Sequence, residues 1–87
     1  MNQENQLKVS DIYLTAYLLS QNIPYKEIKR SVKRRVFFVF PSSEKLISHT
    51  MKYRTNTATV NVRDFTRQID NTREAVFEEL RSDSDRF

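Results

Sequence analysis

The stretch Tyr25–Phe40, YKEIKRSVKRRVFFVF, decides the fold because a basic segment runs directly into an apolar one. Residues 26–35 carry six Lys or Arg side chains and one acid, Glu27. The apolar run 36–40, VFFVF, follows, and Pro41 closes it. Consecutive β-branched and aromatic residues are typical of a strand. The pattern predicts a β-hairpin whose second strand enters the core and whose tip concentrates positive charge.

Within this hairpin we expect strands over 25–30 and 34–40, joined by a turn over 31–33. Alternate residues of the second strand point to opposite faces, and both faces are apolar. This favours a strand that is covered on both sides, or one that offers one face to a partner. The chain contains no glycine, which excludes an Asn-Gly turn.

The rest of the chain predicts three helices and one more strand. Apolar residues at helical spacing favour helices over 11–21, from Ser42-Ser43 to about 54, and over 63–81. Alternation over 58–62 predicts a short third strand. The expected fold is α+β, with a small antiparallel sheet packed against three helices in the order α-β-β-α-β-α.

The polar ends of the chain set the expected domain limits. We expect a single compact domain over 9–81, with disordered tails over 1–8 and 82–87. The N-terminal segment lacks the apolar core of a signal peptide, and no apolar run approaches the ~20 residues of a membrane span. The sequence therefore favours a cytoplasmic protein that does not contact a membrane.

Composition narrows the range of functions. The 87 residues contain no cysteine, which excludes disulfide scaffolds and thiolate metal sites. The absence of glycine also excludes glycine-built phosphate cradles. Residues 1–57 hold ten Lys or Arg against four Asp or Glu (+6), whereas residues 58–87 hold five against seven (−2). A basic body with a mildly acidic end suggests an anionic partner.

The basic hairpin is the first candidate site. Its cations could neutralise backbone phosphates of DNA or RNA, and Tyr25 could stack on a base. We expect Arg30 and Arg34 to be exposed. A charged edge strand that prevents aggregation and docking on an acidic protein surface are the alternatives. The candidate nucleic-acid-binding residues here are Lys26, Lys29, Arg30, Lys33, Arg34 and Arg35.

The second predicted helix carries further cations, Lys45, Lys52 and Arg54, which could extend the basic surface or form a solvated face. Lys45, His49 and Lys52 are spaced four and three apart, so they share one side of the helix. His49 is the single histidine, and its surroundings support neither a metal nor a catalytic role. We expect no enzyme activity, no catalytic residues, no cofactor and no metal.

The aromatic residues are expected mainly in the core, namely Phe37, Phe38, Phe40, Phe65 and Phe77. Phe37 is the one to test as an exposed aromatic on the sheet. The last helix has a long apolar stripe, which packs across the sheet or forms part of a homodimer.

Three segments resemble a small family of uncharacterised bacterial and phage proteins. They are DIYLTAYLL at 11–19, RVFFVF at 35–40 and VNVRDF at 60–65. The family has a DIYLASYLL-like helix, a charged hairpin, an FFVF-like strand and a C-terminal amphipathic helix. Its members often have glycine in the hairpin turn, where this chain has Ser31-Val32-Lys33. The resemblance supports the fold over about 9–81 and implies no activity, while its occurrence in phages and mobile elements favours work with nucleic acid.

Two functions remain open at this point. The first is a small non-catalytic accessory protein that contacts the phosphate backbone of nucleic acid through the basic hairpin and helix. The alternative is a protein-interaction subunit or inhibitor that docks its basic face on a larger nucleoprotein assembly.

Overall fold

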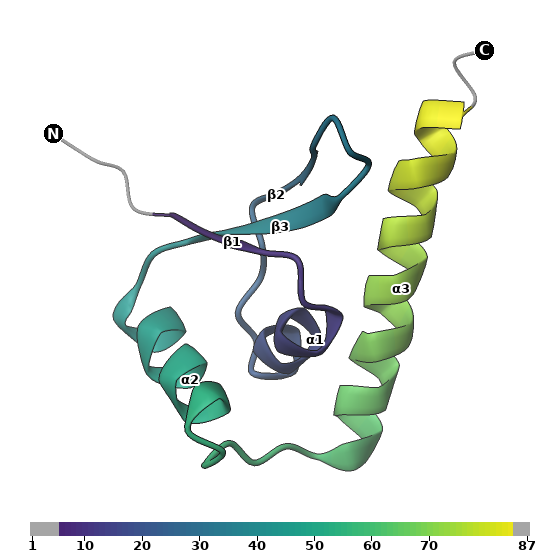
Figure 1. The fold of residues 1–87 in the computed structure, drawn as a ribbon. Helices are drawn as coiled ribbons and strands as arrows, with labels where there is room; N and C mark the ends of the chain where they lie inside the picture. The colour runs from purple at the N-terminus through teal and green to yellow at the C-terminus, as the bar shows by residue number, and fades with distance from the viewer. Residues whose placement is uncertain (1–5, 85–87) are drawn as a thin grey trace, which may run out of the picture.

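Three helices and a three-stranded antiparallel sheet make up the fold (Figure 1). The computed structural model describes residues 6–84. The predicted α+β class is therefore confirmed. The elements are β1 (Gln6–Val9), α1 (Ile12–Ser20), β2 (Glu27–Arg30), β3 (Val36–Pro41), α2 (Glu44–Arg54) and α3 (Val62–Ser84).

The strand order is β1-β3-β2, so the apolar β3 lies in the centre of the sheet. The predicted hairpin forms, with Ile28 opposite Phe38 and Arg30 opposite Val36, but both strands begin two residues later than expected, so residue 34 belongs to the turn. The third strand is not where the sequence placed it. It is β1, in which Val9 lies opposite Phe38, and the elements therefore run β-α-β-β-α-α.

Both the loss of the strand expected over 58–62 and the presence of β1 have a physical reason. Residues 57–61 have no regular secondary structure, and Ala58 and Val60 pack against the core cluster without a strand partner. In β1, Leu7 and Val9 alternate with polar neighbours, and Val9 is only 4% exposed. Burial of these two side chains holds β1 on the sheet. Residues 6–8 thus belong to the domain, while residues 1–5 of the expected tail lie outside the described part.

Each helix start is capped by a side chain. The carboxylate of Asp11 accepts hydrogen bonds from the main-chain nitrogens of Tyr13 and Leu14, at 2.8 and 3.3 Å. Asp11 is therefore the N-cap of α1. Ser43 caps α2, and the Asn61 side chain accepts from the nitrogen of Asp64 at the start of α3.

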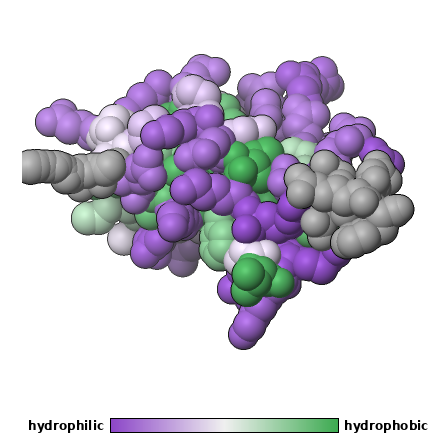
Figure 2. Space-filling view, turned by 90° about the horizontal axis from the view of Figure 1, so that it is seen from above, coloured by the Kyte–Doolittle hydropathy of each residue, from purple (hydrophilic) through white to green (hydrophobic). Residues whose placement is uncertain are grey.

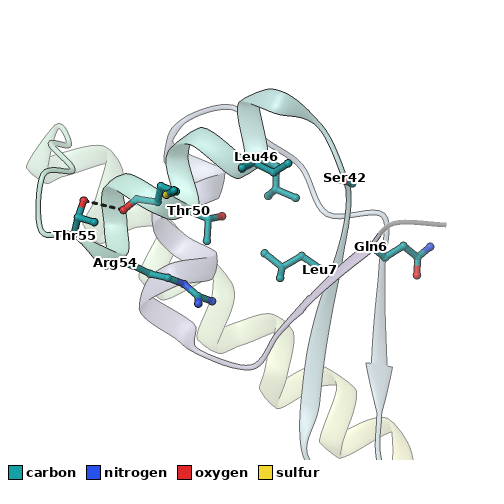
Figure 3. Close-up of a pocket in the computed structure, with 9 residues that line it drawn as sticks. Gln6, Leu7, Ser42, Leu46, Thr50, Arg54 and Thr55 are labelled. Carbon is teal, nitrogen blue, oxygen red and sulfur yellow. Dashed lines mark hydrogen bonds between the residues drawn. The ribbon is translucent and has the colours of Figure 1, made fainter. Parts of the chain in front are cut away.

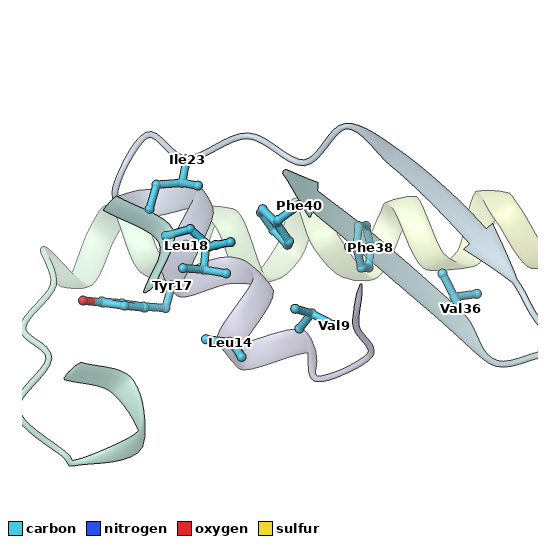
Figure 4. Packing of buried hydrophobic residues seen from close by; sticks show 9 residues of the cluster. Val9, Leu14, Tyr17, Leu18, Ile23, Val36, Phe38 and Phe40 are labelled. Carbon is cyan, nitrogen blue, oxygen red and sulfur yellow. The ribbon is translucent and has the colours of Figure 1, made fainter. Parts of the chain in front are cut away.

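The core lies between α1 and one face of the sheet (Figure 4). Phe38 and Phe40 extend from β3 toward Leu18 on α1, and each of the three is at most 1% exposed. Truncation of such a phenylalanine to alanine typically costs about 3–5 kcal/mol. This central packing fixes the plane of the sheet against α1.

Helix α3 packs beside α1 and runs along the side of the molecule (Figure 1). Thr72 continues its buried stripe and is 2% exposed. Phe77, expected in the core, is instead 68% exposed, because its neighbours Val76 and Leu80 fill the side that packs on the cluster. The helix ends at Ser84, so residues 82–84 of the expected tail are helical and 85–87 lie outside the described part.

Candidate nucleic-acid interface

The register of the hairpin divides its charged residues between the two faces of the sheet. Side chains alternate along a strand, so Ile28 and Arg30 share the core side with Phe38. Glu27 and Lys29 lie on the opposite side, across from Val39 and Phe37. The six cations of the sequence pattern therefore do not form one surface.

Arg30 belongs to the core side of the sheet. Its Nη1 donates to a carboxylate oxygen and to the main-chain carbonyl oxygen of Glu79, each at 2.9 Å. The side chains of this pair are 21% and 30% exposed. The expectation of an exposed Arg30 is thus wrong, because this side chain ties β2 to the C-terminal part of α3.

The other face of the sheet is polar and basic. Phe37 is half-buried there and does not pack against the core cluster. It lies opposite Lys29, and Lys8 lies opposite Val39 on the same face. Arg35 lies in the turn just before β3, and its side chain is exposed. Seen from above, the side of the molecule away from α1 is mostly hydrophilic (Figure 2).

Val39 is fully buried although it points to this polar face. Its cross-strand neighbours are Lys8 and Glu27. Long charged side chains often cover apolar surface with their aliphatic stems and keep the charge in water. The aliphatic stems of Lys8 and Glu27 thus account for the burial of Val39 on this face.

The hairpin tip is held by Ser31. Its hydroxyl oxygen accepts from the main-chain nitrogens of Lys33 and Arg35, at 3.2 and 3.3 Å. Its main-chain nitrogen also donates to the carbonyl oxygen of Arg35, at 2.9 Å. Arg34 turns the chain with φ of 65°, a conformation that usually favours glycine. This turn places Lys33, Arg34 and Arg35 on the surface, where all three are exposed.

We define the basic face as the cations of the outer sheet face and the hairpin tip. Glu27 is the acid on this sheet face, with a carboxylate oxygen 3.9 Å from the Lys29 ammonium. Lys8 was missed from the sequence because residues 1–8 resembled a polar tail. The alternation in Gln6–Val9 was the signal that could have found it. The basic face consists of Lys8, Lys29, Lys33, Arg34 and Arg35.

Two further hairpin candidates lie apart from the tip. Lys26 is exposed just before β2, at the end of the strand away from the turn. Tyr25 is half-buried, with its ring centroid 5.0 Å from that of Phe38 and 6.2 Å from that of Phe40. These edge-to-face contacts explain the position of the Tyr25 ring by core packing, without a ligand. We therefore do not include Tyr25 in the interface.

The cations of α2 form a separate surface. Lys45, Lys52 and Arg54 are exposed, but α2 lies beside α1, on the core side of the sheet (Figure 1). The structure does not bring them together with the basic face. From the sequence, the cations of the hairpin and of α2 were expected to extend one surface, because the sequence does not show the direction of α2.

His49 occupies the inner side of α2. Burial lowers the pKa of His49, and the positive charges of Lys52 and Lys45 lower it further. Burial also raises the pKa of Tyr17, whose hydroxyl oxygen lies 3.0 Å from His49 Nδ1. Both groups are therefore neutral, and their hydrogen bond is a structural contact between α1 and α2.

The described residues contain no group of three or more His, Cys, Asp and Glu side chains that could hold a metal ion. Within the same residues, no helix is both long and apolar enough to cross a bilayer.

A family profile described as "Domain of unknown function (DUF5659)" matches residues 4–77. The chain belongs to this family. This confirms the resemblance to an uncharacterised family. The DUF5659 match includes the sheet, the basic face and α2, and it ends before Glu79, the partner of Arg30. No curated protein and no solved structure shows a significant similarity to the chain.

Proposed function

We propose that this protein binds nucleic acid through the basic face, without catalysis. The supporting observation is the concentration of exposed Lys and Arg side chains on the outer sheet face and hairpin tip, with Glu27 as the acid among them. Such a surface neutralises phosphates and releases counterions, which gives affinity with little sequence preference. We place this accessory role in the cytoplasm, since a chain without cysteine suits a reducing compartment.

The shape of the basic face supports the same proposal. The hairpin tip lies beside the C-terminal part of α3 in Figure 1, away from α1 and α2, and could follow the groove or backbone of a polynucleotide. Half-buried Phe37 lies among these cations and offers an aromatic edge to an unstacked base. An acidic protein surface would meet the same charges, and this alternative is an outcome of the test below.

The test is fluorescence anisotropy of labelled single-stranded and duplex oligonucleotides, titrated with the protein at several salt concentrations. We expect micromolar or tighter binding at low salt, with affinity falling steeply as salt rises. The variant Lys33→Glu/Arg35→Glu should bind at least about tenfold more weakly, with a salt slope smaller by about two. Both side chains are exposed, so the stability of the fold should change little.

The matched control is Lys45→Glu/Lys52→Glu, which changes the net charge equally on the separate α2 surface. Binding by this control should remain close to that of the unaltered protein. Equal losses in the two double variants would show that only net charge matters and would remove the basic face from the mechanism. If no oligonucleotide binds at low salt, the proposal fails and a protein partner becomes the favoured ligand.

A further inference from the structure

Helix α2 exposes an apolar ridge that nothing in the described fold covers. Ile47 and Met51 are 57% and 60% exposed and lie one helical turn apart. Neighbouring exposed side chains of this size at helical spacing are typical of a surface that receives a partner. Helix α2, which carries the ridge, lies apart from the turn between β2 and β3 in Figure 1.

A groove runs along one side of this ridge, between α2 and the beginning of β1 (Figure 3). Its volume is about 520 Å³. Leu46 on α2 and Leu7 on β1 face one another across it in Figure 3. Its apolar lining comes from Leu7, Leu46, Ile47 and Met51, and its polar lining from Gln6, Ser42, Thr50, Arg54 and Thr55.

The charged groups around the ridge are mainly positive. Arg54 lines the groove, and a shallower hollow on the other side of the ridge is lined by Lys52 and Glu44. Lys45 adds another exposed cation to the helix, so α2 carries three exposed cations against one acid. An apolar surface with a positive border is complementary to an apolar segment with acidic flanks.

We propose that this groove binds an acidic amphipathic helix of a partner protein. Apolar side chains of that helix would lie against Ile47 and Met51 and fill the space toward Leu7. Its carboxylates would pair with Arg54 and Lys52 on the two sides of the ridge. The 11 residues of α2 span about 16 Å, which is the length of three turns of a docked helix.

Charge argues against a second copy of this chain docked through the same groove. Two α2 helices packed on each other would bring the cations of both copies together, and like charges repel. The proposed groove is also separate from the basic face. It would let one molecule hold a nucleic acid and an acidic partner protein at the same time, and it does not depend on the nucleic-acid proposal.

The probe is a library of displayed random peptides of about 16 residues, long enough for four helical turns. We expect enriched peptides to carry apolar residues three and four positions apart, flanked by Asp or Glu. An enriched peptide, synthesised with a fluorophore, is then titrated by anisotropy against the protein and its variants. Met51→Asp should weaken binding about tenfold or more, as loss of an interface anchor does.

Two matched controls separate the groove from general effects. Val32 is 100% exposed at the hairpin tip, so Val32→Asp makes the same kind of change away from the groove and should leave binding unchanged. Arg54→Glu should weaken binding by at least about two- to fivefold, whereas Lys33→Glu should have a smaller effect. Thermal unfolding of each variant verifies that it folds.

Three results would overturn the proposal. One is enrichment of no peptide, or of peptides without acidic flanks. Another is an equal loss of affinity in Met51→Asp and Val32→Asp. The last is a doubled mass in sedimentation that Met51→Asp returns to that of a single chain, because the groove would then be a contact between copies.

Discussion

The guanidinium Nη1 of Arg30 lies 2.9 Å from both the carboxylate and the main-chain carbonyl oxygen of Glu79, which is 49 residues later in the chain. A residue of the basic hairpin is thus used to fix α3 against the sheet. Since charged hydrogen bonds at partly buried sites are stronger than exposed ones, this contact should be visible in stability and absent from ligand binding.

A double-mutant cycle tests this contact. Arg30→Met and Glu79→Gln should each lower the free energy of unfolding by about 1–3 kcal/mol, with a coupling energy near ~1 kcal/mol. The exposed pair Arg81–Glu78, with side chains 56% and 63% exposed, is the comparison and should couple by less than about 1 kcal/mol. Urea unfolding provides the measurement. Additive losses at Arg30 and Glu79 would mean that the bond does not stabilise the fold.

Glycine at position 34 should relieve backbone strain in the hairpin turn. Arg34 has φ of 65°, where a Cβ atom costs roughly 1 kcal/mol. Arg34→Gly should therefore be more stable than Arg34→Ala by about 1 kcal/mol. Both variants lack the guanidinium, so the comparison isolates the backbone. The φ of Arg35 is not positive, so Arg35→Ala should be more stable than Arg35→Gly. Thermal unfolding of the four variants measures both differences.

The pKa of His49 predicts a dependence of stability on pH. Burial and two lysines hold this pKa below the ordinary value of 6.5, so the unfolded chain binds the proton more readily. The stability from this site is complete above about pH 6.5 and is lost as the pH falls through the lower folded pKa. The free energy of unfolding, measured by urea at several pH values, should fall over this range.

His49→Gln is the control for that measurement, since it removes the titrating group. Its stability should change less between neutral and mildly acidic pH than that of the unaltered protein. An identical pH profile in the two proteins would assign the change to other groups. The contact with Tyr17 should be weakened at every pH, because the imidazole is gone.

Phe37 should favour single strands over duplexes if the basic face binds nucleic acid. Phe37→Leu keeps an apolar side chain but removes the aromatic ring, and base stacking on such a ring is worth about 1–3 kcal/mol. We expect weaker binding of single-stranded oligonucleotides in anisotropy titrations and little change for duplexes. Phe77→Leu changes an exposed aromatic on α3 and should leave both affinities unaltered. A loss for duplexes as large as that for single strands would exclude stacking.

The sequence predicted the elements whose signals are local. The run VFFVF specified β3, and Ser42-Ser43 marked the start of α2. It failed where the partner is distant. The four residues of β1 become a strand by pairing with one edge of β3, which lies far along the chain.

Part of the candidate site could not be predicted for the same reason. Lys29 and Arg30 are adjacent in the sequence, yet the side chain of Lys29 lies on the outer face of the sheet and that of Arg30 on the core side. A shift of one residue in register would exchange them, and register depends on contacts across the whole fold. Phe77 was expected in the core and is exposed, because the apolar stripe of α3 alone does not show which of its residues contact the core.

The packing of α1 on α3 has a consequence for how the chain folds during synthesis. The hydroxyl of Tyr13 on α1 accepts a hydrogen bond from Arg73 on α3, 60 residues later. While the ribosome has produced only the sheet and α2, the side of α1 that α3 covers remains open to water. Folding that depends on contacts this distant in sequence is slow compared with local helix formation. We therefore expect nascent chains halted before α3 to be sensitive to proteases and prone to aggregation until that helix emerges.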